Sequence, residues 1–283
     1  AILIARYDAT SLEIMRAIRW TIIALLPITT AIVYFTVPEP DEPIGTTKFD
    51  FKKAAATVLT NGPFMRLTLA SLVVTLGETF RQSTTVFFAR DVVGGQNIGQ
   101  VYLYNFIAAL IFIPGWSMLA RRIEKHRALI LALLIVALTN GLMVFLGAGD
   151  NVHFYALFVL KGACYGGVVV LPYAMIADTV DVDTAESLDR QQGLFYSVEA
   201  MVQKLGSALG AGIPLILLAF VGYNAAGDTG ADPLFALSLI YSLVPSALVL
   251  IAAFMVVGYS LTASKQVELR SQITERKSQL SES

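Results

Sequence analysis

The chain has 283 residues, of which 56% are hydrophobic and 14% charged, with a mean hydropathy of +0.68 and a formal net charge of -1. A soluble domain carries about a quarter charged residues, so this composition predicts a membrane protein. The near-zero net charge and the lack of a long basic stripe in the sequence exclude a nucleic-acid partner. A single cysteine, Cys164, excludes an intrachain disulfide, and two histidines, His126 and His153, exclude a histidine-based metal cluster.

The sequence begins at Ala1 without a methionine, and its first five residues resemble the end of an apolar segment. It shows no basic start followed by an apolar run and a small-residue cleavage site, which would mark a signal peptide. We therefore expect the chain to be part of a longer protein.

Seven apolar stretches are long enough to cross a bilayer, which takes about 20 residues of helix. Four of them carry no charge, and three carry charges inside the stretch. In chain order they are residues 20–37, 64–89, 98–120, 128–147, 152–177, 193–221 and 233–261. The predicted fold class is thus an all-α membrane protein of about seven transmembrane helices.

The longest connection, residues 38–63, is polar and mixed in charge, and it predicts a linker that ends in a short amphipathic piece around Lys52-Lys53. Residues 264–283 alternate charged and apolar side chains, which favours a solvated or interface-lying helix. The connection around Arg121 and Arg122 is rich in basic residues, so we expect it on the cytoplasmic side. Alternation of the spans then places the linker, the 178–192 loop and the tail in the cytoplasm as well.

Three charged residues, Arg66, Glu78 and Arg81, lie in the second stretch, and one lies in the fifth. Glu78 and Arg81 are three positions apart, so they share a helix face and are expected either to pair with each other or to line an aqueous cavity. Lys161 lies well inside its span, where its ammonium cannot easily reach the bilayer surface. We expect it on a cavity wall or paired with Glu199 of a neighbouring helix.

The sixth stretch contains Glu199 and Lys204. Five residues separate them, about 140° around a helix, so each needs a partner elsewhere. Charge inside a bilayer usually marks a substrate or ion pathway or an internal ion pair. Lys204 is expected either to bind solute or compete with a coupling cation, or to form a structural salt bridge.

Asp178 and Asp181 follow the fifth stretch, at the expected C-terminal end of its helix. Carboxylates there oppose the helix dipole and need basic partners. Arg190 is one candidate, and the linker, the tail or a part of the protein outside this chain could supply others. Ion pairs that form in one state and break in another suit a gate, and a solvated loop cap is the alternative.

Small residues recur within two of the stretches. They predict close helix packing, which in a carrier would also let helices slide. They are Gly206, Gly210 and Gly212 in one stretch, and Gly162, Gly166 and Gly167 in the other.

Residues within and around the fifth and sixth stretches resemble a motif of the glycoside–pentoside–hexuronide:cation symporter family (melibiose permease-like) of the major facilitator superfamily. The resemblance covers the chain from about Trp20 to the tail. The matching residues are Ala177-Asp178, Val180-Asp181, Arg190, Tyr196-Ser197-Val198, Met201-Val202, Lys204, Gly206-Ser207-Ala208 and Gly222-Tyr223.

The resemblance implies a major facilitator-type bundle, in which the chain supplies the sixth helix and the C-terminal six-helix domain. Residues 1–37 would end the N-terminal domain, 38–63 would be a cytoplasmic linker, 64–261 the six-helix domain and 262–283 a cytoplasmic tail. It further implies that Lys204 lies near the solute and cation sites. Asp178, Asp181 and Arg190 would then belong to a cytoplasmic gate.

The sequence departs from the family pattern in three places. Val182-Asp183-Thr184 replaces Tyr-Gly-Glu, Gln192 replaces a Glu, and Glu199-Ala200 replaces a polar Gln-Thr pair. The last change removes a hydroxyl and adds a carboxylate, which puts sodium coupling in question and leaves proton coupling through Glu199 open.

The sequence therefore predicts a multi-pass protein of the cell membrane that works as a secondary active transporter. Its expected cargo is a sugar, glycoside or related organic solute, coupled to Na+ or H+. Its expected partners are that solute, the cation, the lipid bilayer and a facing N-terminal six-helix domain. The alternatives are a carrier of lysolipid or another amphiphile, and a scaffold or sensor that transports nothing. No enzyme activity and no cofactor are expected, because the sequence holds no catalytic grouping or phosphate-cradling loop.

Overall fold

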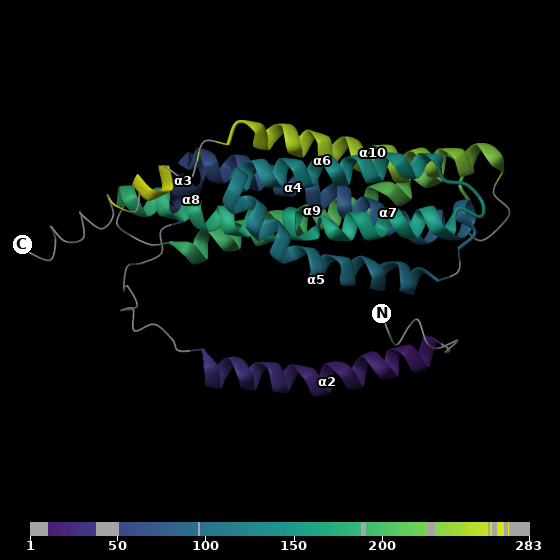
Figure 1. Ribbon diagram of the computed structural model, residues 1–283, viewed down its shortest axis with the longest axis horizontal. Helices are drawn as coiled ribbons and strands as arrows, with labels where there is room; N and C mark the ends of the chain where they lie inside the picture. Colours follow the sequence, from purple (N-terminus) through teal and green to yellow (C-terminus); the bar gives the residue numbers. More distant parts are fainter. Residues whose placement is uncertain are drawn as a thin grey trace, which may run out of the picture. The chain divides into compact units, whose positions relative to one another are not determined.

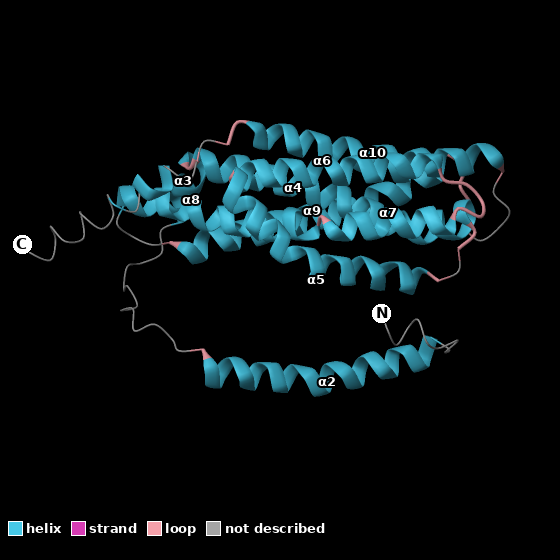
Figure 2. Ribbon diagram, viewed as in Figure 1, coloured by secondary structure: helices cyan, strands magenta, loops and turns pink. Residues whose placement is uncertain are grey.

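The computed structural model describes residues 11–37, 51–95, 97–187, 191–225, 230–259, 261, 265–268 and 271. All the regular structure in these ranges is helical (Figure 2), as the sequence predicts. The chain divides into two compact units, Ala1–Asp50 and Phe51–Ser283. Asp181 and the other site residues discussed below belong to the second unit. Arg190 lies outside the described residues.

The first unit contains one long helix, α2 (Ser11–Thr36), of 26 residues. Its stretch Met15–Thr36 is long and apolar enough to cross a bilayer. Pro27 stands inside this helix. The hydroxyls of Thr29 and Thr30 donate to backbone carbonyls of the preceding turn, at 2.9 and 2.8 Å. These bonds satisfy polar groups that hydrocarbon could not.

The second unit is a bundle of long helices lying side by side (Figure 1). A short helix, α3 (Phe51–Thr60), precedes it, at the place where the amphipathic piece was expected. The long elements are α4 (Gly62–Phe87), α5 (Ile98–Ile123), α6 (Lys125–Leu142), α7 (Asn151–Ala163), α8 (Leu171–Ser187), α9 (Gln192–Phe220) and α10 (Ala231–Val257). Two π-helical segments, η1 (Phe88–Val93) and η3 (Gly166–Val170), interrupt this pattern.

Six helical stretches within the described ranges, including that of α2, meet the length and hydropathy of a membrane span. Helix α4 is also 26 residues long but is not among the six, since it carries Arg66, Glu78 and Arg81. It nevertheless packs along both α9 and α10 within the bundle. The expected set of about seven spans is therefore present, with α4 as the polar member.

Glycines allow the closest helix contacts. An added Cβ at Gly210 of α9 would lie 2.6 Å from the backbone oxygen of Leu76 in α4. An added Cβ at Gly162 of α7 would lie 2.2 Å from the backbone oxygen of Asn105 in α5. Only a residue without Cβ permits these approaches, which confirms the packing role predicted for both positions.

The fifth predicted span is interrupted near its middle. Helix α7 ends at Ala163, a turn at Cys164 follows, and the π-helical η3 leads into α8. The indole nitrogen of Trp116 in α5 donates to the Ala163 oxygen at 2.6 Å, so another helix satisfies a carbonyl at the break. An added Cβ at Gly167 would lie 2.5 Å from Cβ of Ala132, so the irregular segment is tightly enclosed.

The predicted loop 178–192 is wrong over much of its length, because α8 continues to Ser187. Two hydroxyls bond back to the helix here, that of Thr179 to the Ile176 oxygen and that of Thr184 to the Val180 oxygen. Asp178 and Asp181 therefore lie within the helix rather than at its end, and the expected opposition to the helix dipole does not apply.

Candidate functional site

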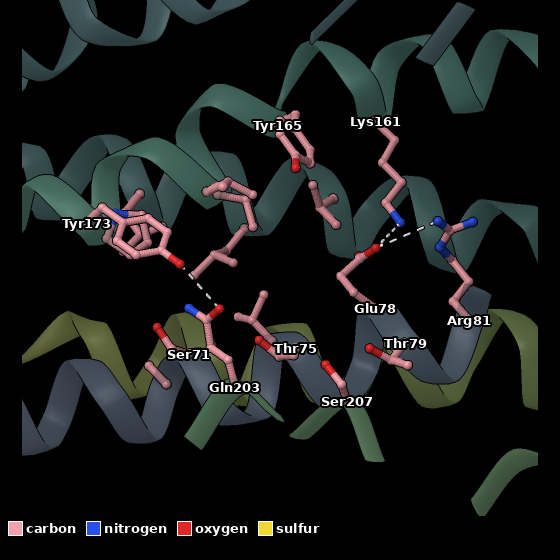
Figure 3. Close-up of a pocket in the computed structure, with 18 of the residues that line it drawn as sticks. Ser71, Thr75, Glu78, Thr79, Arg81, Lys161, Tyr165, Tyr173, Gln203 and Ser207 are labelled. Carbon is pink, nitrogen blue, oxygen red and sulfur yellow. Dashed lines mark hydrogen bonds and ion pairs between the residues drawn. The ribbon is translucent and has the colours of Figure 1, made fainter. Parts of the chain in front are cut away.

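A cavity of about 560 Å³ lies among α4, α5, α6, α7, α8 and α9 (Figure 3). Its polar lining consists of hydroxyls, carboxamides and charged groups, interspersed with apolar side chains. The polar residues are Ser71, Thr75, Glu78, Thr79, Arg81, Gln82, Tyr102, Asn105, Lys161, Tyr165, Tyr173, Glu199, Gln203 and Ser207. A pocket of this size, with a few convergent polar groups, is the usual form of a small-molecule site.

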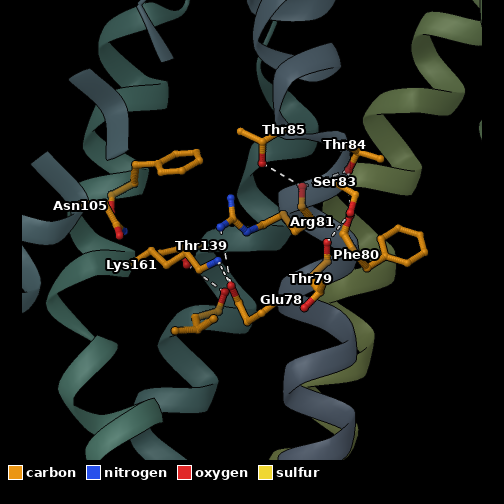
Figure 4. Close-up of polar contacts among 12 residues, drawn as sticks. Glu78, Thr79, Phe80, Arg81, Ser83, Thr84, Thr85, Asn105, Thr139 and Lys161 are labelled. Atoms are coloured by element: carbon orange, nitrogen blue, oxygen red, sulfur yellow. Dashed lines mark hydrogen bonds and ion pairs between the residues drawn. The ribbon is translucent and has the colours of Figure 1, made fainter. Parts of the chain in front are cut away.

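Three charged side chains meet at one end of this cavity (Figure 4). Lys161 Nζ lies 2.5 Å from Glu78 Oε2, and Arg81 Nη2 lies 3.6 Å from the same oxygen. Lys161 occupies the last turn of α7, where the partial negative charge of the helix end favours an ammonium. The Glu78–Arg81 pairing agrees with their three-residue spacing. Lys161 pairs with Glu78 rather than with the Glu199 considered from the sequence.

Arg81 has further contacts that hold its guanidinium in place. Its Nη1 donates to the hydroxyl oxygen of Tyr241 at 3.3 Å, and its Cζ lies 4.9 Å from the ring centroid of Phe158. Two polar atoms of the cluster, Glu78 Oε1 and Arg81 Nε, are buried without a hydrogen-bond partner. The cluster holds two cations and one anion, so it carries net positive charge and spare hydrogen-bonding capacity toward a solute.

The other end of the cavity is formed by α8 and α9 around Glu199. Its side chain is buried, with 1% of the residue exposed. Gln203 Nε2 donates to Glu199 Oε1 at 2.9 Å, and the Tyr173 hydroxyl lies 3.4 Å from Gln203 Oε1. In Figure 3, Tyr173 and Gln203 lie at the opposite end of the cavity from Lys161 and Arg81.

Lys204 is separate from this cavity. Its side chain is exposed, and it is not among the residues that line the space around Glu199. The 140° turn between the two positions explains the separation. Its assignment to the solute or cation pathway stays a prediction.

Asp178 of the predicted gate is buried and ion-paired. Its Oδ2 lies 2.6 Å from Nζ of Lys125, the first residue of α6. The Asp178 carboxyl is almost fully enclosed, whereas Lys125 is 37% exposed. The two residues also line a second cavity of about 380 Å³, together with Arg121 and Tyr259. The solvated loop cap considered for Asp178 is therefore wrong, and its observed partner comes from the basic connection between α5 and α6.

A third polar cluster lies in η1, the segment that directly follows α4. Arg90 Nε donates to Asp91 Oδ1 at 2.5 Å, and the Tyr223 hydroxyl donates to Asp91 Oδ2. The Arg90 hydrogen bond lowers the pKa of Asp91. Burial, with the Asp91 hydrogen bond and charge, raises the pKa of Tyr223 to about 12. The cluster thus joins η1 to the connection between α9 and α10.

Several cavity residues were not identified from the sequence. Gln203, Tyr165 and Tyr173 lie within apolar stretches. An amide or phenol at a depth where lipid hydrocarbon surrounds a span is the sequence feature that could have identified them. Lys125 belongs to the basic connection around Arg121 and Arg122 and was not predicted as a site residue. No pattern along the chain indicates its pairing with Asp178, 53 positions away.

The family model for "MFS/sugar transport protein" matches residues 2–263. The chain belongs to this family. The recognised resemblance to the cation symporters of the major facilitator superfamily is confirmed. The MFS/sugar transport family consists of transporters, so the expectation of a non-enzyme is confirmed by family membership. With its apolar helices, this member of the family is a multi-pass membrane protein, as predicted.

Two relatives in the curated set illustrate the family's range. The chain is 28% identical over 228 residues to the glucuronide carrier protein homolog of Escherichia coli, covering 78% of this chain and 49% of the relative. It is 23% identical over 251 residues to the sodium-dependent lysophosphatidylcholine symporter 1-A of Danio rerio, covering 83% of this chain and 46% of the relative. The chain thus spans about half the length of the curated relatives it matches.

A solved structure shows the same fold. The crystal structure of a variant of the E. coli fucose:proton symporter, FucP, matches with a TM-score of 0.58 at 15% identity, over 86% of this chain and 55% of that one. This match, together with the helical bundle, confirms the major facilitator-type fold class.

Proposed function

We propose that the protein is a secondary active transporter in which a cation gradient drives uptake of a sugar, glycoside or related polar organic solute. The observation that carries this proposal is the cavity of about 560 Å³ and its lining of hydroxyls, carboxamides, phenols and the Glu78–Arg81–Lys161 cluster. A solute with many hydroxyls can exchange hydrogen bonds with such a surface. Midplane binding between two rocking helical domains is the general design of such carriers.

In this proposal the residues have distinct roles. Glu78, Arg81 and Lys161 bind the solute at one end of the cavity, and Glu199 acts at the other. Lys204 acts from the exposed face of α9, opposite a second six-helix domain that would complete the site. The relatives' greater length and the exposed Met201, Leu205 and Leu209 on the same helix support that second domain. Asp178, Asp181 and Arg190 form the gate, with Lys125 as an additional member.

The second candidate cargo is a lysolipid, since one relative bears the name of a lysophosphatidylcholine symporter. Apolar side chains also line the cavity, but its charged and hydroxyl groups favour the hydroxylated solute, because they would lose hydrogen-bond partners against an acyl chain. A scaffold or sensor has less support, because it would not need charged groups around an internal cavity.

The test is uptake into membrane vesicles that contain the full-length protein, with panels of labelled glycosides and of labelled lysophosphatidylcholine. Each panel is measured under an imposed pH gradient, an imposed sodium gradient and no gradient. Gradient-driven glycoside uptake that Lys161→Met and Lys204→Ala abolish, and that Arg122→Met leaves unchanged, supports the proposal. Arg122 is a suitable control because it is exposed at the end of α5. Uptake of lysolipid alone would replace the sugar with an amphiphile as cargo.

A further inference from the structure

Glu199 has hydrogen-bonding capacity that no described residue uses. Its Oε1 accepts the bond from Gln203, but its Oε2 is buried and has no hydrogen-bond partner. The residue is 1% exposed and lines the cavity. A buried carboxylate oxygen without a donor loses its hydration and gains no hydrogen bond in return, which is unfavourable.

Glu199 also lacks an ion-pair partner within the described part of the chain. Glu78, Asp91 and Asp178 each have a basic side chain within 4.0 Å, and Glu199 does not. The nearest basic residue along its own helix, Lys204, is exposed and points away. Burial of an unpaired carboxylate is unfavourable, and its free oxygen is open to a proton or a ligand cation.

The positive cluster at the other end of the cavity is too far away to supply the missing charge. Gly206 of α9 packs against Leu72 of α4, and Gly210 packs against Leu76, four residues further along both helices. The two helices therefore run in the same direction. At 1.5 Å per residue, this register places Glu199 roughly 15–20 Å from Glu78 along the helix axes. Glu199 is therefore an independent acidic centre in the same cavity.

The titratable and charged groups facing this region come from every neighbouring element. They are Glu78 and Arg81 on α4, Tyr102 on α5, Lys161 on α7, Tyr165 before η3, Tyr173 and Asp178 on α8, and Tyr196 on α9, whereas Lys204 lies on the exposed face of α9. Helix α10 contributes Val256 to the lining, and its charged residue Asp232 lies in its first turn, at the other end of that helix.

The surroundings of Glu199 suit a proton better than a metal ion. A hard cation takes several oxygen ligands at once, and among the described residues Glu199 is the one carboxylate at this end of the cavity lining. Gln203 presents its amide N–H groups to the carboxylate, and N–H groups repel a cation. A proton needs only the single free oxygen that Oε2 offers.

We propose that Glu199 is the proton-binding carboxyl through which this carrier couples solute to H+. Oε2 takes one proton from water in the cavity when the cavity opens to the side of higher proton concentration. It returns the proton to water on the opposite side, and no other bond forms or breaks. Bound solute excludes water from Glu199, so the loaded carrier crosses only with the proton bound, whereas the empty cavity keeps water at the carboxylate and lets the unloaded carrier return without a proton. This inference rests on the proposed transport function and names its coupling ion and residue.

The first test needs no solute. Infrared difference spectra are recorded for the purified full-length protein, as wild type minus Glu199→Gln and as wild type minus Ser197→Ala. We expect a carboxylic-acid carbonyl band, shifted by D2O and lost as the pH is raised, in the first difference only. Ser197 is two residues away on the same helix and exposed, and its hydroxyl donates to the Gly193 oxygen. A first difference without such a band would overturn the proposal whatever the cargo proves to be.

The second test uses the glycoside that wild-type vesicles accumulate. Glutamine keeps the shape of the neutral acid, so Glu199→Gln should retain solute exchange within about twofold. It should lose proton-driven accumulation by about tenfold or more, the size of a typical coupling between two sites. Solute-induced alkalinisation of the medium should also disappear, whereas Ser197→Ala should behave as wild type. Alkalinisation that persists in Glu199→Gln, or exchange lost along with accumulation, would contradict the proposal. Failure of wild type to move any solute would instead count against the proposed function.

Discussion

Lys161 and Glu78 form an ion pair of 2.5 Å between helices α7 and α4, and Arg81 lies 3.6 Å from the same carboxylate oxygen. The two basic side chains therefore share one carboxylate as their counter-ion. Removal of one partner from a buried ion pair costs about 3–5 kcal/mol, because the other charge is left uncompensated.

We predict that Glu78→Gln lowers the free energy of unfolding by about 3 kcal/mol or more, because it leaves two buried cations without an acid. Lys161→Met should cost less, since Glu78 keeps Arg81. Thermal unfolding of the purified protein in detergent measures both, with the exposed Glu268→Gln as the control. Equal losses, or a larger loss for Lys161→Met, would show that Arg81 does not share the carboxylate.

The glycines of α9 give a second prediction. An added Cβ at Gly210 would meet the Leu76 backbone oxygen at 2.6 Å, whereas one at Gly212 would have nothing within 4 Å. We expect Gly210→Ala to destabilise the protein by about 1–3 kcal/mol through overpacking. Gly212→Ala should leave it unchanged or stabilise it by about 0.5–1 kcal/mol through helix propensity. Thermal unfolding of the two variants side by side checks this, and similar midpoints would contradict the α4–α9 contact.

In the Lys125–Asp178 pair, the Asp178 carboxyl is buried and the Lys125 side chain is partly exposed. The two single substitutions should therefore differ in their cost to stability. Lys125→Met leaves the enclosed Asp178 carboxylate without a partner, at a cost of about 2–3 kcal/mol. Asp178→Asn leaves Lys125, 37% exposed, free to turn toward water, and should cost about 1 kcal/mol. A double-mutant cycle with unfolding measurements gives the coupling, with Arg122→Met as the control at the same turn. The reverse order of costs would mean that Asp178 has another cationic partner.

The Asp91–Tyr223 contact predicts a defined pH dependence. The pKa of Asp91 is lowered, so its contribution to stability is present above the unfolded-state pKa of about 3.9 and is lost as the pH falls through the folded value. The pKa of Tyr223 is raised to about 12, so its contribution is present below about 10 and is lost as the pH rises through 12.

Tyr223→Phe removes the hydroxyl donor and should lower stability by about 0.5–1.5 kcal/mol between those limits. The deficit relative to wild type should shrink on both sides of this pH window. Unfolding midpoints of both proteins across the pH range measure it, with Tyr34→Phe on α2 as the control. A deficit that does not change from neutral to strongly alkaline pH would exclude the hydroxyl bond as its cause.

The spans could be predicted from the sequence because a segment in hydrocarbon must satisfy its own backbone hydrogen bonds, so a long apolar run becomes a helix. The Glu78–Arg81 pair follows from the same helical period. The partners of Lys161 and Asp178 could not be predicted, since each lies on another helix and depends on how the bundle packs. The length of α8 could not be predicted either, because acidic residues such as Asp178 favour a helix end unless a basic partner such as Lys125 neutralises them.

Trp116 donates its indole N–H to the carbonyl where α7 ends, and the chain has only one other tryptophan, Trp20 on α2. Replacing Trp20 with phenylalanine would therefore leave one tryptophan in this chain, bonded to the break in the fifth span. Its emission maximum and its quenching by brominated lipids would report the environment of that break without any attached label. The protein thus carries its own optical probe at the junction between α7 and α8.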